Sequence, residues 1–417
     1  MQQTTENTQK DDSLWMLILF LINPFFSLVF SIKNYLSRYS RNIVMLFCGF
    51  YGLTFYPVRE SMDSFRHRED FVEWASQTDI TFDQFASRLY SEDVKYVDVF
   101  MPLLKFVVSR FTDDVGIFYA ILGLLFGYYL SRNIWLLVDH CKDKLTRNLG
   151  IVLFTVAFVI GPWEINSFRF WIGAQMFMFY GYNYLVLKKK RHLIGLIATP
   201  FIHFGFFFTL VVFAVYKLAG NRLHIYFMIF LASLVINSFP VVNIQSYIPE
   251  TSLDALNKKT TSYTSDDYIE GRAEVASELN WYVAFKVKPL NFTTFLLIAF
   301  LYFRKRKELL ESKYLSLLCF SLLLMSLSYA IMGEVPTFFR YFRTSLLMFY
   351  AFLFLFMVNG DEQWYKKFYP LQVFATVFYI IVEIRIWFDT ATVDTFISNP
   401  IVAFISQTYI CVINFIK

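Results

Sequence analysis

Three arginines, Arg169, Arg340 and Arg343, are the residues whose type and position most strongly indicate chemistry. Each opens a long apolar run, in NSFRFWIGAQMFMFYGYNYLVL and in PTFFRYFRTSLLMFYAFLFLF. An arginine costs about 2.5–3.5 kcal/mol at the centre of a membrane-spanning helix and less near its end. Its guanidinium makes forked contacts to phosphate. A membrane protein that keeps three such cations at equivalent depths is predicted to bind an anion there.

The stretch DSFRHREDF brings acids and bases together shortly after an early apolar run. Asp63 lies three residues before Arg66 and four before His67, so a helix would put them on one face. One interpretation is a catalytic carboxylate beside phosphate-binding arginines, Arg59 and Arg66. The other is a solvated amphipathic turn with ordinary ion pairs, and the spacing alone favours this second interpretation.

Two further residues are candidates for proton transfer. His203, in TPFIHFGFFF, either accepts a proton or donates a hydrogen bond at membrane depth, or is satisfied by a backbone carbonyl. Glu334 precedes Arg340 by six residues and is a candidate to orient it or to act as a base. Asp98, Glu383 and Arg385 give weaker signals of the same kind.

The elements that must position these residues are transmembrane helices. The 417 residues are 57% hydrophobic and 21% aromatic but only 17% charged, which predicts a single all-α polytopic membrane domain over residues 1–417. The basic residues form short clusters between apolar runs, so nucleic-acid binding is not expected. The four cysteines form no CxxC pair, and no ligand cluster is visible. We therefore expect no metal and no cofactor.

Apolar runs long enough to span a membrane are numerous. They lie near 43–57, 115–138, 148–162, 168–187, 223–240, 289–303, 314–333, 337–358, 368–388 and 400–416. Two more, 13–31 and 193–216, contain a proline and have the length of one span or of a re-entrant hairpin. The prediction is about 10–12 transmembrane helices plus re-entrant or interfacial helices.

Basic clusters set the topology. KKKRH at 188–192 and RKRK at 304–307 should be cytoplasmic. The chain then crosses an even number of times between them, which favours a hairpin at 193–216 turning near Pro200–Gly205 over a full span with one further crossing. Loops 32–42 and 139–147 fall inside. The outer loop 58–111, with an interfacial helix at 99–111, and the large loop 241–288 fall outside, as do the three arginines.

The order of these segments resembles the EpsG-like branch of the Wzy-type polysaccharide repeat-unit polymerases. The matching pieces are DSFRHREDF, DVFMPLLKFVVSRFTDDVGIFYAILGLLFGYYL, FRFWIGAQMFMFYGYNYLVLKKKRHLIGLIATPFIHFGFFFTLVVFAVY and FFRYFRTSLLMFY. Arg169, His203, Arg340, Arg343 and Asp63 fall on family-typical positions. The chain departs from the family pattern at Phe65 and His67, where a tyrosine often follows the loop aspartate.

The resemblance implies a GT-C-like fold and a glycosyltransferase on the outer, periplasmic face of the bacterial cytoplasmic membrane. Its partners would be undecaprenyl-diphosphate-linked oligosaccharide and membrane lipid, with a chain-length regulator as a further candidate. Arg169, Arg340 and Arg343 would stabilise the leaving diphosphate, with Arg59 or Arg66 at the rim. Asp63 is the first choice of base, then His203 or Glu334. An O-antigen ligase-like transferase and a flippase for lipid-linked sugar remain alternatives.

Overall fold

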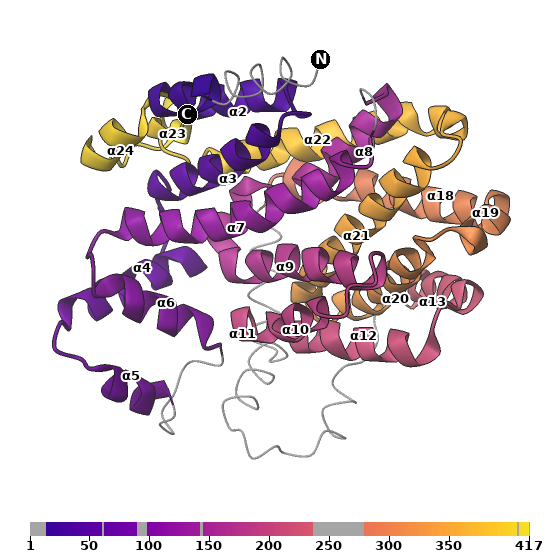
Figure 1. Ribbon diagram of the computed structural model, residues 1–417, viewed down its shortest axis with the longest axis horizontal. Coiled ribbons are helices and arrows are strands. Elements are labelled where there is room, and N and C mark those ends of the chain that lie inside the picture. The colour runs from indigo at the N-terminus through magenta and orange to yellow at the C-terminus, as the bar shows by residue number, and fades with distance from the viewer. Residues whose placement is uncertain are drawn as a thin grey trace, which may run out of the picture.

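A computed structural model of the protein describes residues 14–60, 62–89, 98–141, 145–236, 279–406 and 408–416. Within these ranges the secondary structure is helical (Figure 1), and strand-like pairing is limited to two isolated bridges, Phe55 with Ala391 and Thr392 with Cys411. The prediction of an all-α fold is confirmed for this part of the chain. Residues 241–278 of the predicted large outer loop lie outside the described residues.

Six helical stretches in the described ranges are long and apolar enough to cross a membrane, as expected of a multi-pass membrane protein. They are Val115–Val138 (α7), Arg147–Leu185, Trp281–Arg304, Leu315–Met332 (α20), Pro336–Val358 and Tyr369–Trp387 (α22). The 39-residue stretch consists of α8 (Arg147–Val159), the 3-10 helix η1 (Pro162–Ser167) and α9 (Phe168–Leu185). The third contains α17 (Trp281–Phe285) and α18 (Lys288–Arg304), and the fifth contains η2 (Pro336–Phe338) and α21 (Phe339–Val358).

The other helices are shorter than a full span. They are α2 (Pro24–Lys33), α3 (Arg38–Leu53), α4 (Asp63–Ser76), α5 (Phe82–Leu89), α6 (Phe100–Ser109), α10 (His192–Ile197), α11 (Thr199–Ile202), α12 (Phe206–Ala219), α13 (Leu223–Val235), α19 (Arg306–Glu311), η3 (Gln363–Lys367), α23 (Asp394–Ile397), α24 (Pro400–Ser406) and η4 (Val412–Phe415). The predicted spans 43–57 and 223–240 correspond to α3 and α13, which have 16 and 13 residues. The expected count of 10–12 full spans is therefore not reached by the described residues.

The predicted span at 400–416 is wrong. α24 has seven residues, and the chain then turns back so that the Val412 N–H donates to the carbonyl of Ala391 at 3.0 Å. The Asp394 carboxylate accepts from the Ser406 hydroxyl at 3.2 Å and from the Thr408 N–H at 3.3 Å. These bonds satisfy the backbone at the turn, so an apolar run that looks continuous in sequence ends its helix early.

The N-terminal run 13–31, which the sequence left open between a span and a hairpin, folds as a hairpin. Residues 14–22 are helical, and Asn23 then caps α2 by accepting from the Phe26 N–H at 2.9 Å. The Ser27 hydroxyl donates to the Met16 carbonyl at 3.1 Å, which places the two arms side by side. Proline at the first position of α2 suits this sharp restart.

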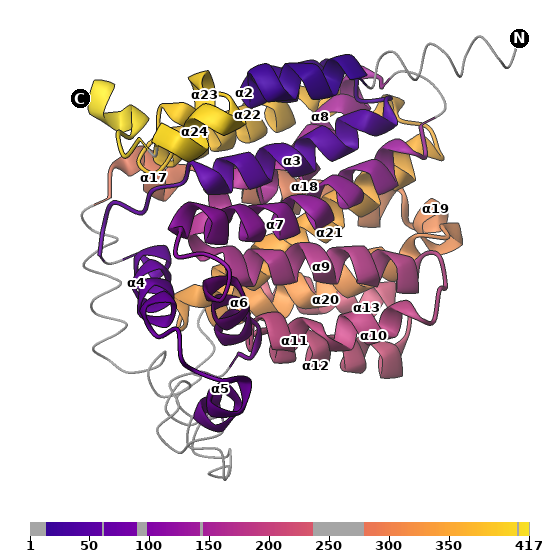
Figure 2. The same cartoon turned by 60° about the vertical axis from the view of Figure 1, so that its left-hand side comes forward.

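α21 is the central helix of the bundle. Every residue from Tyr341 to Met357 is buried, and α8, α9 and α20 pack around it. Figures 1 and 2 show it enclosed by these neighbours. A helix that is apolar on all sides is stable only when other helices cover all of it, so the position of its first residues, including Arg340, is fixed by the whole bundle.

The basic loops gather at one end of the bundle, called the basic end below. The Leu145 N–H donates to the Tyr35 hydroxyl at 2.9 Å, which joins loop 32–42 to loop 139–147. The His140 ring lies 3.3 Å from the Tyr182 hydroxyl near the end of α9, and Ser316 at the start of α20 donates to the Leu185 carbonyl at 3.0 Å. The loops that the sequence assigned to one side of the membrane therefore do lie together.

In the predicted outer loop 58–111, the described residues form a small helical unit, called the cap, made of α4, α5 and α6. Figure 2 shows it at the end opposite to α19. Trp74, Phe85 and Phe106 form its own apolar cluster, with the rings of Phe85 and Phe106 stacked at 4.5 Å. The helix predicted at 99–111 is confirmed as α6, but it packs against α4 rather than standing alone.

The segment 193–216 turns back on itself, as the hairpin interpretation predicted. α10 and α11 run along α9, the turn lies at residues 203–205, and α12 returns against α20. Gly173 makes the close approach possible, because a Cβ there would lie 2.5 Å from the ring of Phe206. The hairpin thus carries His203 to the end of the bundle where α9 begins.

Glycines also allow the close contact between α3 and α7. A Cβ on Gly52 would lie 2.2 Å from the carbonyl oxygen of Tyr119, and one on Gly123 would lie 2.1 Å from that of Cys48. Backbone cannot move away as a flexible side chain can. Small residues are the usual means of bringing membrane helices this close.

We expect Gly52→Ala or Gly123→Ala to destabilise the protein by about 1–3 kcal/mol, because the added methyl must push two backbones apart. Thermal unfolding of the detergent-purified protein measures this. Gly150→Ala in α8 is the matched control, since nothing lies within 4 Å of its Cβ position. It should unfold at or above the wild-type temperature. Equal stability of all three variants would contradict the close approach.

Candidate functional site

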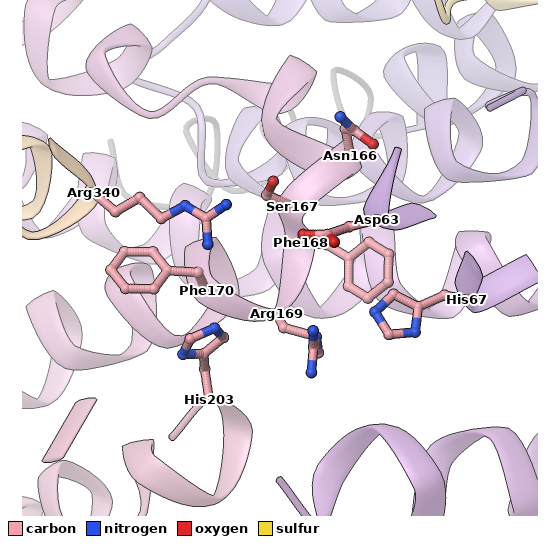
Figure 3. A pocket seen from close by; sticks show the side chains of 9 residues that line it. All are labelled: Asp63, His67, Asn166, Ser167, Phe168, Arg169, Phe170, His203 and Arg340. Atoms are coloured by element: carbon pink, nitrogen blue, oxygen red, sulfur yellow. The ribbon is translucent and has the colours of Figure 1, made fainter. Parts of the chain in front are cut away.

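A small polar pocket lies where the cap, the start of α9, the hairpin turn and the start of α21 meet. It is lined by Asp63, His67, Asn166, Ser167, Phe168, Arg169, Phe170, His203 and Arg340. Figure 3 shows Arg340 and His203 on one side of the start of α9, and Asp63 and His67 on the other. Four of the residues singled out by the sequence, from four separate elements, therefore line one pocket.

Asp98 ties two of these elements together. Its Oδ2 lies 2.7 Å from Nη1 of Arg169, and its Oδ1 accepts from the backbone N–H of Phe204 at 2.6 Å. The side chains of Asp98 and Arg169 are 3% and 23% exposed. One buried carboxylate thus orients the arginine of α9 and holds the hairpin turn beside it.

His203 is held in a defined orientation at the hairpin turn. Its Nδ1 accepts from the Gly205 N–H at 3.0 Å, and its ring meets that of Phe170 edge-on at 5.2 Å. The Tyr341 hydroxyl donates to the Gly205 carbonyl at 2.8 Å. With Nδ1 accepting, the neutral ring carries its proton on Nε2. This histidine is arranged as a hydrogen-bond donor rather than as a base.

Arg340 is the cation of the pocket without a carboxylate. Its guanidinium lies over the rings of Phe170 and Phe339, at 5.7 and 5.9 Å. Among the described residues it forms no ion pair, and its buried Nε has no hydrogen-bond partner. An arginine placed in this way is short of acceptors, which an anionic ligand would supply.

Asp63 is the first residue of α4 and forms the ion pair with Arg66 that helical spacing predicted. Its side chain is 30% exposed, whereas that of Arg66 is 68% exposed, and Arg66 is not part of the pocket lining. His67, one turn later, places its ring 5.5 Å from that of Phe168. Both the carboxylate and this imidazole therefore face the start of α9.

Two contacts fix the cap against the bundle at this point. The Ser64 hydroxyl donates to Oδ1 of Asn166 at 2.6 Å, and the Tyr119 hydroxyl donates to the Ser64 carbonyl at 2.5 Å. They hold the first turn of α4 next to η1. The position of Asp63 in the pocket thus depends on polar contacts from two other elements.

The expectation that Arg343 shares the anion with Arg340 is not met. Nη2 of Arg343 lies 2.5 Å from Oε1 of Glu164, and both its Nε and Nη2 bond to the Val159 carbonyl. The Tyr379 hydroxyl lies 2.5 Å from the same Nη2. The side chain is buried and meets three oxygen atoms, from Glu164, Val159 and Tyr379, so Arg343 joins α21 to α8, η1 and α22 instead of lining the pocket.

Glu334 and Arg59 do not reach the pocket either. Glu334 forms no ion pair with Arg340 within the described residues. Arg59 is 66% exposed and lies 3.7 Å from Oδ2 of Asp389. The two weaker candidates in α22 have partners outside the pocket: Glu383 pairs with Lys286 at 3.0 Å and Arg385 with Asp389 at 3.0 Å.

Lys105, in α6 of the cap, is a buried cation. Its side chain is fully buried, and its Nζ lies 2.6 Å from Oδ2 of Asp70. Burial lowers the pKa of Lys105 to about 8, and the Asp70 carboxylate acts in the opposite direction by favouring the charged amine. This pair holds α6 to α4 one turn beyond the pocket residues.

Sequence reasoning identified Asp98 only as a weaker candidate and did not assign His67 or Asn166 to the site. Asp98 carried a usable signal, since a carboxylate directly before an apolar helix usually has a cationic partner. His67 lay in a stretch already marked by its charges. Asn166 carried no signal, because an asparagine before a helix is an ordinary capping residue.

The pocket offers no donor set for a metal ion. Among the described residues, no three histidine, cysteine or acidic side chains come together. Its cavity volume is about 10 Å³, which is room for about one water molecule. In this form it can contact a single oxygen atom of a ligand rather than enclose a diphosphate.

Comparisons with protein-family models, with curated proteins and with solved structures returned no match.

We expect Asp98→Ala to lower stability by about 3–5 kcal/mol, because Arg169 loses its carboxylate in a buried setting. Thermal unfolding in detergent measures this. The stability of Asp98→Asn should lie between those of Asp98→Ala and wild type, since the asparagine keeps an acceptor for the Phe204 N–H. The control is Asp83→Ala, an exposed carboxylate of α5 that should change stability by less than about 0.5 kcal/mol. Similar losses in Asp98→Ala and Asp83→Ala would refute the clamp.

The Lys105 amine should titrate near pH 8 rather than near its ordinary value, so it is paired with Asp70 below that pH and neutral above it. Asp70→Asn should move the midpoint lower still, because the attraction that favours the charged form is gone. NMR of protein labelled at the lysine Cε, with Lys105→Met for assignment, gives both midpoints. A higher midpoint in Asp70→Asn would contradict the pair.

Proposed function

We propose that the protein is a glycosyltransferase that polymerises lipid-linked oligosaccharide repeat units at the non-cytoplasmic face of a bacterial cytoplasmic membrane. The observation that carries the proposal is Arg340, a cation in a pocket with Arg169 and His203 and with no carboxylate of its own among the described residues. Three donors from three elements converge where an anion can be held. A diphosphate linked to a lipid is the anion we propose.

In the proposed reaction, a sugar hydroxyl of one repeat unit attacks the anomeric carbon of another. The bond from that carbon to the diphosphate oxygen breaks, and the electron pair leaves with the lipid diphosphate. Arg169 and Arg340 stabilise the charge that develops on the leaving oxygen, and Nε2–H of His203 donates to it. Because the pocket is narrow, we propose that one phosphate oxygen enters it while the rest lies along its rim.

Asp63 takes the acceptor proton in this proposal. It lines the pocket opposite Arg340, and its contact with Arg66 orients the carboxylate. Arg66 therefore acts on Asp63 rather than on the diphosphate. His203 is set aside as the base, since its Nδ1 is occupied by the Gly205 N–H.

The proposed orientation of the protein in the membrane follows from the basic end of the bundle. Loops 139–147 and 188–192 lie there, and the pocket lies where α9 and α21 begin, at the opposite end. The positive-inside rule assigns basic loops to the cytoplasm. The pocket would then face the periplasm or exterior, where lipid-linked repeat units are polymerised.

Arg169→Ala, Arg340→Ala and His203→Ala should each give surface glycan of single repeat units with export retained, because the leaving group is no longer stabilised while the donor still arrives. Loss of one preorganised donor costs about 10²–10³ in rate. Gel analysis of the surface glycan in a strain lacking the chromosomal copy measures this.

The matched control is Arg59→Ala, an exposed arginine at the same end that does not line the pocket. It should give wild-type chain length. Loss of all surface glycan in the three pocket variants would favour a flippase, and loss only of transfer to a final acceptor would favour a ligase-like transferase. Wild-type chains in all three would overturn the site assignment.

A further inference from the structure

A second and larger cavity lies at the pocket end of the bundle, beside α4. Its volume is about 340 Å³, within the range of about 300–1,000 Å³ typical of small-molecule sites. It is walled by the end of α3, the start of α7, Arg68 of α4 and the C-terminal segment near Thr408. In Figure 2, α23 and α24 lie on one side of the ends of α3 and α7, and α4 lies on the other.

The walls of this cavity are held together by hydrogen bonds to backbone carbonyls. The Tyr56 N–H donates to the Thr390 carbonyl at 3.1 Å, and the Thr392 hydroxyl donates to the Thr54 carbonyl at 2.8 Å. The Val393 N–H donates to the Ile410 carbonyl at 3.0 Å. The segments that carry the lining side chains are thus fixed relative to one another before any ligand binds.

Aromatic rings form one part of the lining. The rings of Tyr56 and Tyr409 lie 4.9 Å apart at 44°, and Arg68 lies over the Tyr56 ring at 5.3 Å. Tyr409 is 58% exposed. Its ring therefore offers a flat apolar surface to whatever occupies the cavity, with a polar tip beside it.

Charged groups form the other part. Arg68 forms no ion pair within the described residues, and Asp113 forms neither an ion pair nor a hydrogen bond there. They have opposite charge and line the same cavity, yet they lie more than 4.0 Å apart. The donors of Arg68 and the acceptors of Asp113 both remain to be satisfied by water or by a ligand.

The other two carboxylates of the lining are already used. Oδ1 of Asp114 caps α7 by accepting from the Gly116 N–H at 2.6 Å. Asp394 holds the turn after α24. Asp113 is therefore the carboxylate of this cavity that a ligand would meet.

We infer that this cavity binds carbohydrate, and that it receives the glycan part of the lipid-linked substrate. A sugar ring has an apolar face that stacks on an aromatic ring and hydroxyls around its edge that both donate and accept. The cavity offers two rings, a donor and an acceptor for those groups. An acyl chain would leave Arg68 and Asp113 without partners. The identity of the glycan, though not the presence of the site, rests on the proposed function.

The place of the cavity suits this role. Arg68 follows His67 directly on α4, so it points about 100° further round the helix and faces the cavity instead of the pocket. Asp63 begins the same helix, about 7.5 Å from Arg68 along its axis. α4 is therefore the wall between the larger cavity and the pocket, with the proposed base at its first residue.

Saturation-transfer NMR on the full-length protein in detergent tests the inference. The probe is the oligosaccharide released by mild acid from the producing cell's own surface polysaccharide, without lipid or phosphate. Wild type should bind it. Tyr409→Ala should weaken binding about tenfold, which corresponds to about 1.4 kcal/mol, whereas Tyr409→Trp should keep it because the stacking surface remains.

Tyr39→Ala is the control, since Tyr39 is also an exposed tyrosine but lies at the other end of α3, away from the cavity. It should bind as wild type does. Arg340→Ala should also bind the free oligosaccharide normally, which separates this test from the test of the proposed function. No binding by wild type, or equal binding by Tyr409→Ala and wild type, would overturn the inference.

Discussion

The carboxylate of Asp98 is the contact on which the pocket depends. It meets Arg169 with one oxygen and the backbone of the hairpin turn with the other. Without it, the start of α9 and the hairpin turn would lose the polar contacts through which Asp98 joins them. A buried ion pair adds little to stability compared with an apolar pair, but it fixes position, because the removal of either partner leaves an unpaired charge. That is the property a preorganised site needs.

Three arginines with similar sequence surroundings have three different environments. Arg169 has a carboxylate, and Arg343 has a carboxylate, a carbonyl and a tyrosine. Arg340 lies over aromatic rings and forms no ion pair with any residue that the structure describes. Their ion-pair partners distinguish the three arginines, whereas their sequence surroundings do not. A cation that is already satisfied inside the protein is costly to redirect to a ligand, so Arg343 is a structural residue. Its pair with Glu164 and the pair of Lys286 with Glu383 are closed within the bundle, which gives no support to a charged path across the membrane.

The sequence predicted the helical class, the hairpin at 193–216 and the gathering of the basic loops. These follow from hydrophobic run length and charge bias, which act locally. It also predicted that Asp63, Arg169, His203 and Arg340 are functional, and the structure brings these four together. The sequence-based predictions were wrong where the same local pattern is compatible with two different structures. An apolar run such as 400–416 does not show that the Asp394 carboxylate and backbone bonds to 391–393 turn the chain back. The spacing of Arg340 and Arg343 puts them on one side of α21, but neither Glu164 nor Val159 can be identified as a partner from sequence.

The pocket and the neighbouring cavity differ in size and lining, and so in the kind of ligand group that each can select. The pocket has a volume of about 10 Å³ and presents cations, whereas the neighbouring cavity has about 340 Å³ and presents rings with one donor and one acceptor. A small cationic pocket can discriminate strongly for charge and weakly for shape. A larger aromatic cavity discriminates weakly for charge and more strongly for shape. Stacking tolerates many sugar rings, but fixed polar groups select the positions of the hydroxyls. In a lipid-linked glycan the diphosphate and the sugars are neighbours, and here α4 separates the two sites by the width of one helix. Under the proposed function, a change in the sugars of the repeat unit would therefore be accommodated at Tyr56, Arg68 and Asp113 without any change to Arg169, His203 or Arg340.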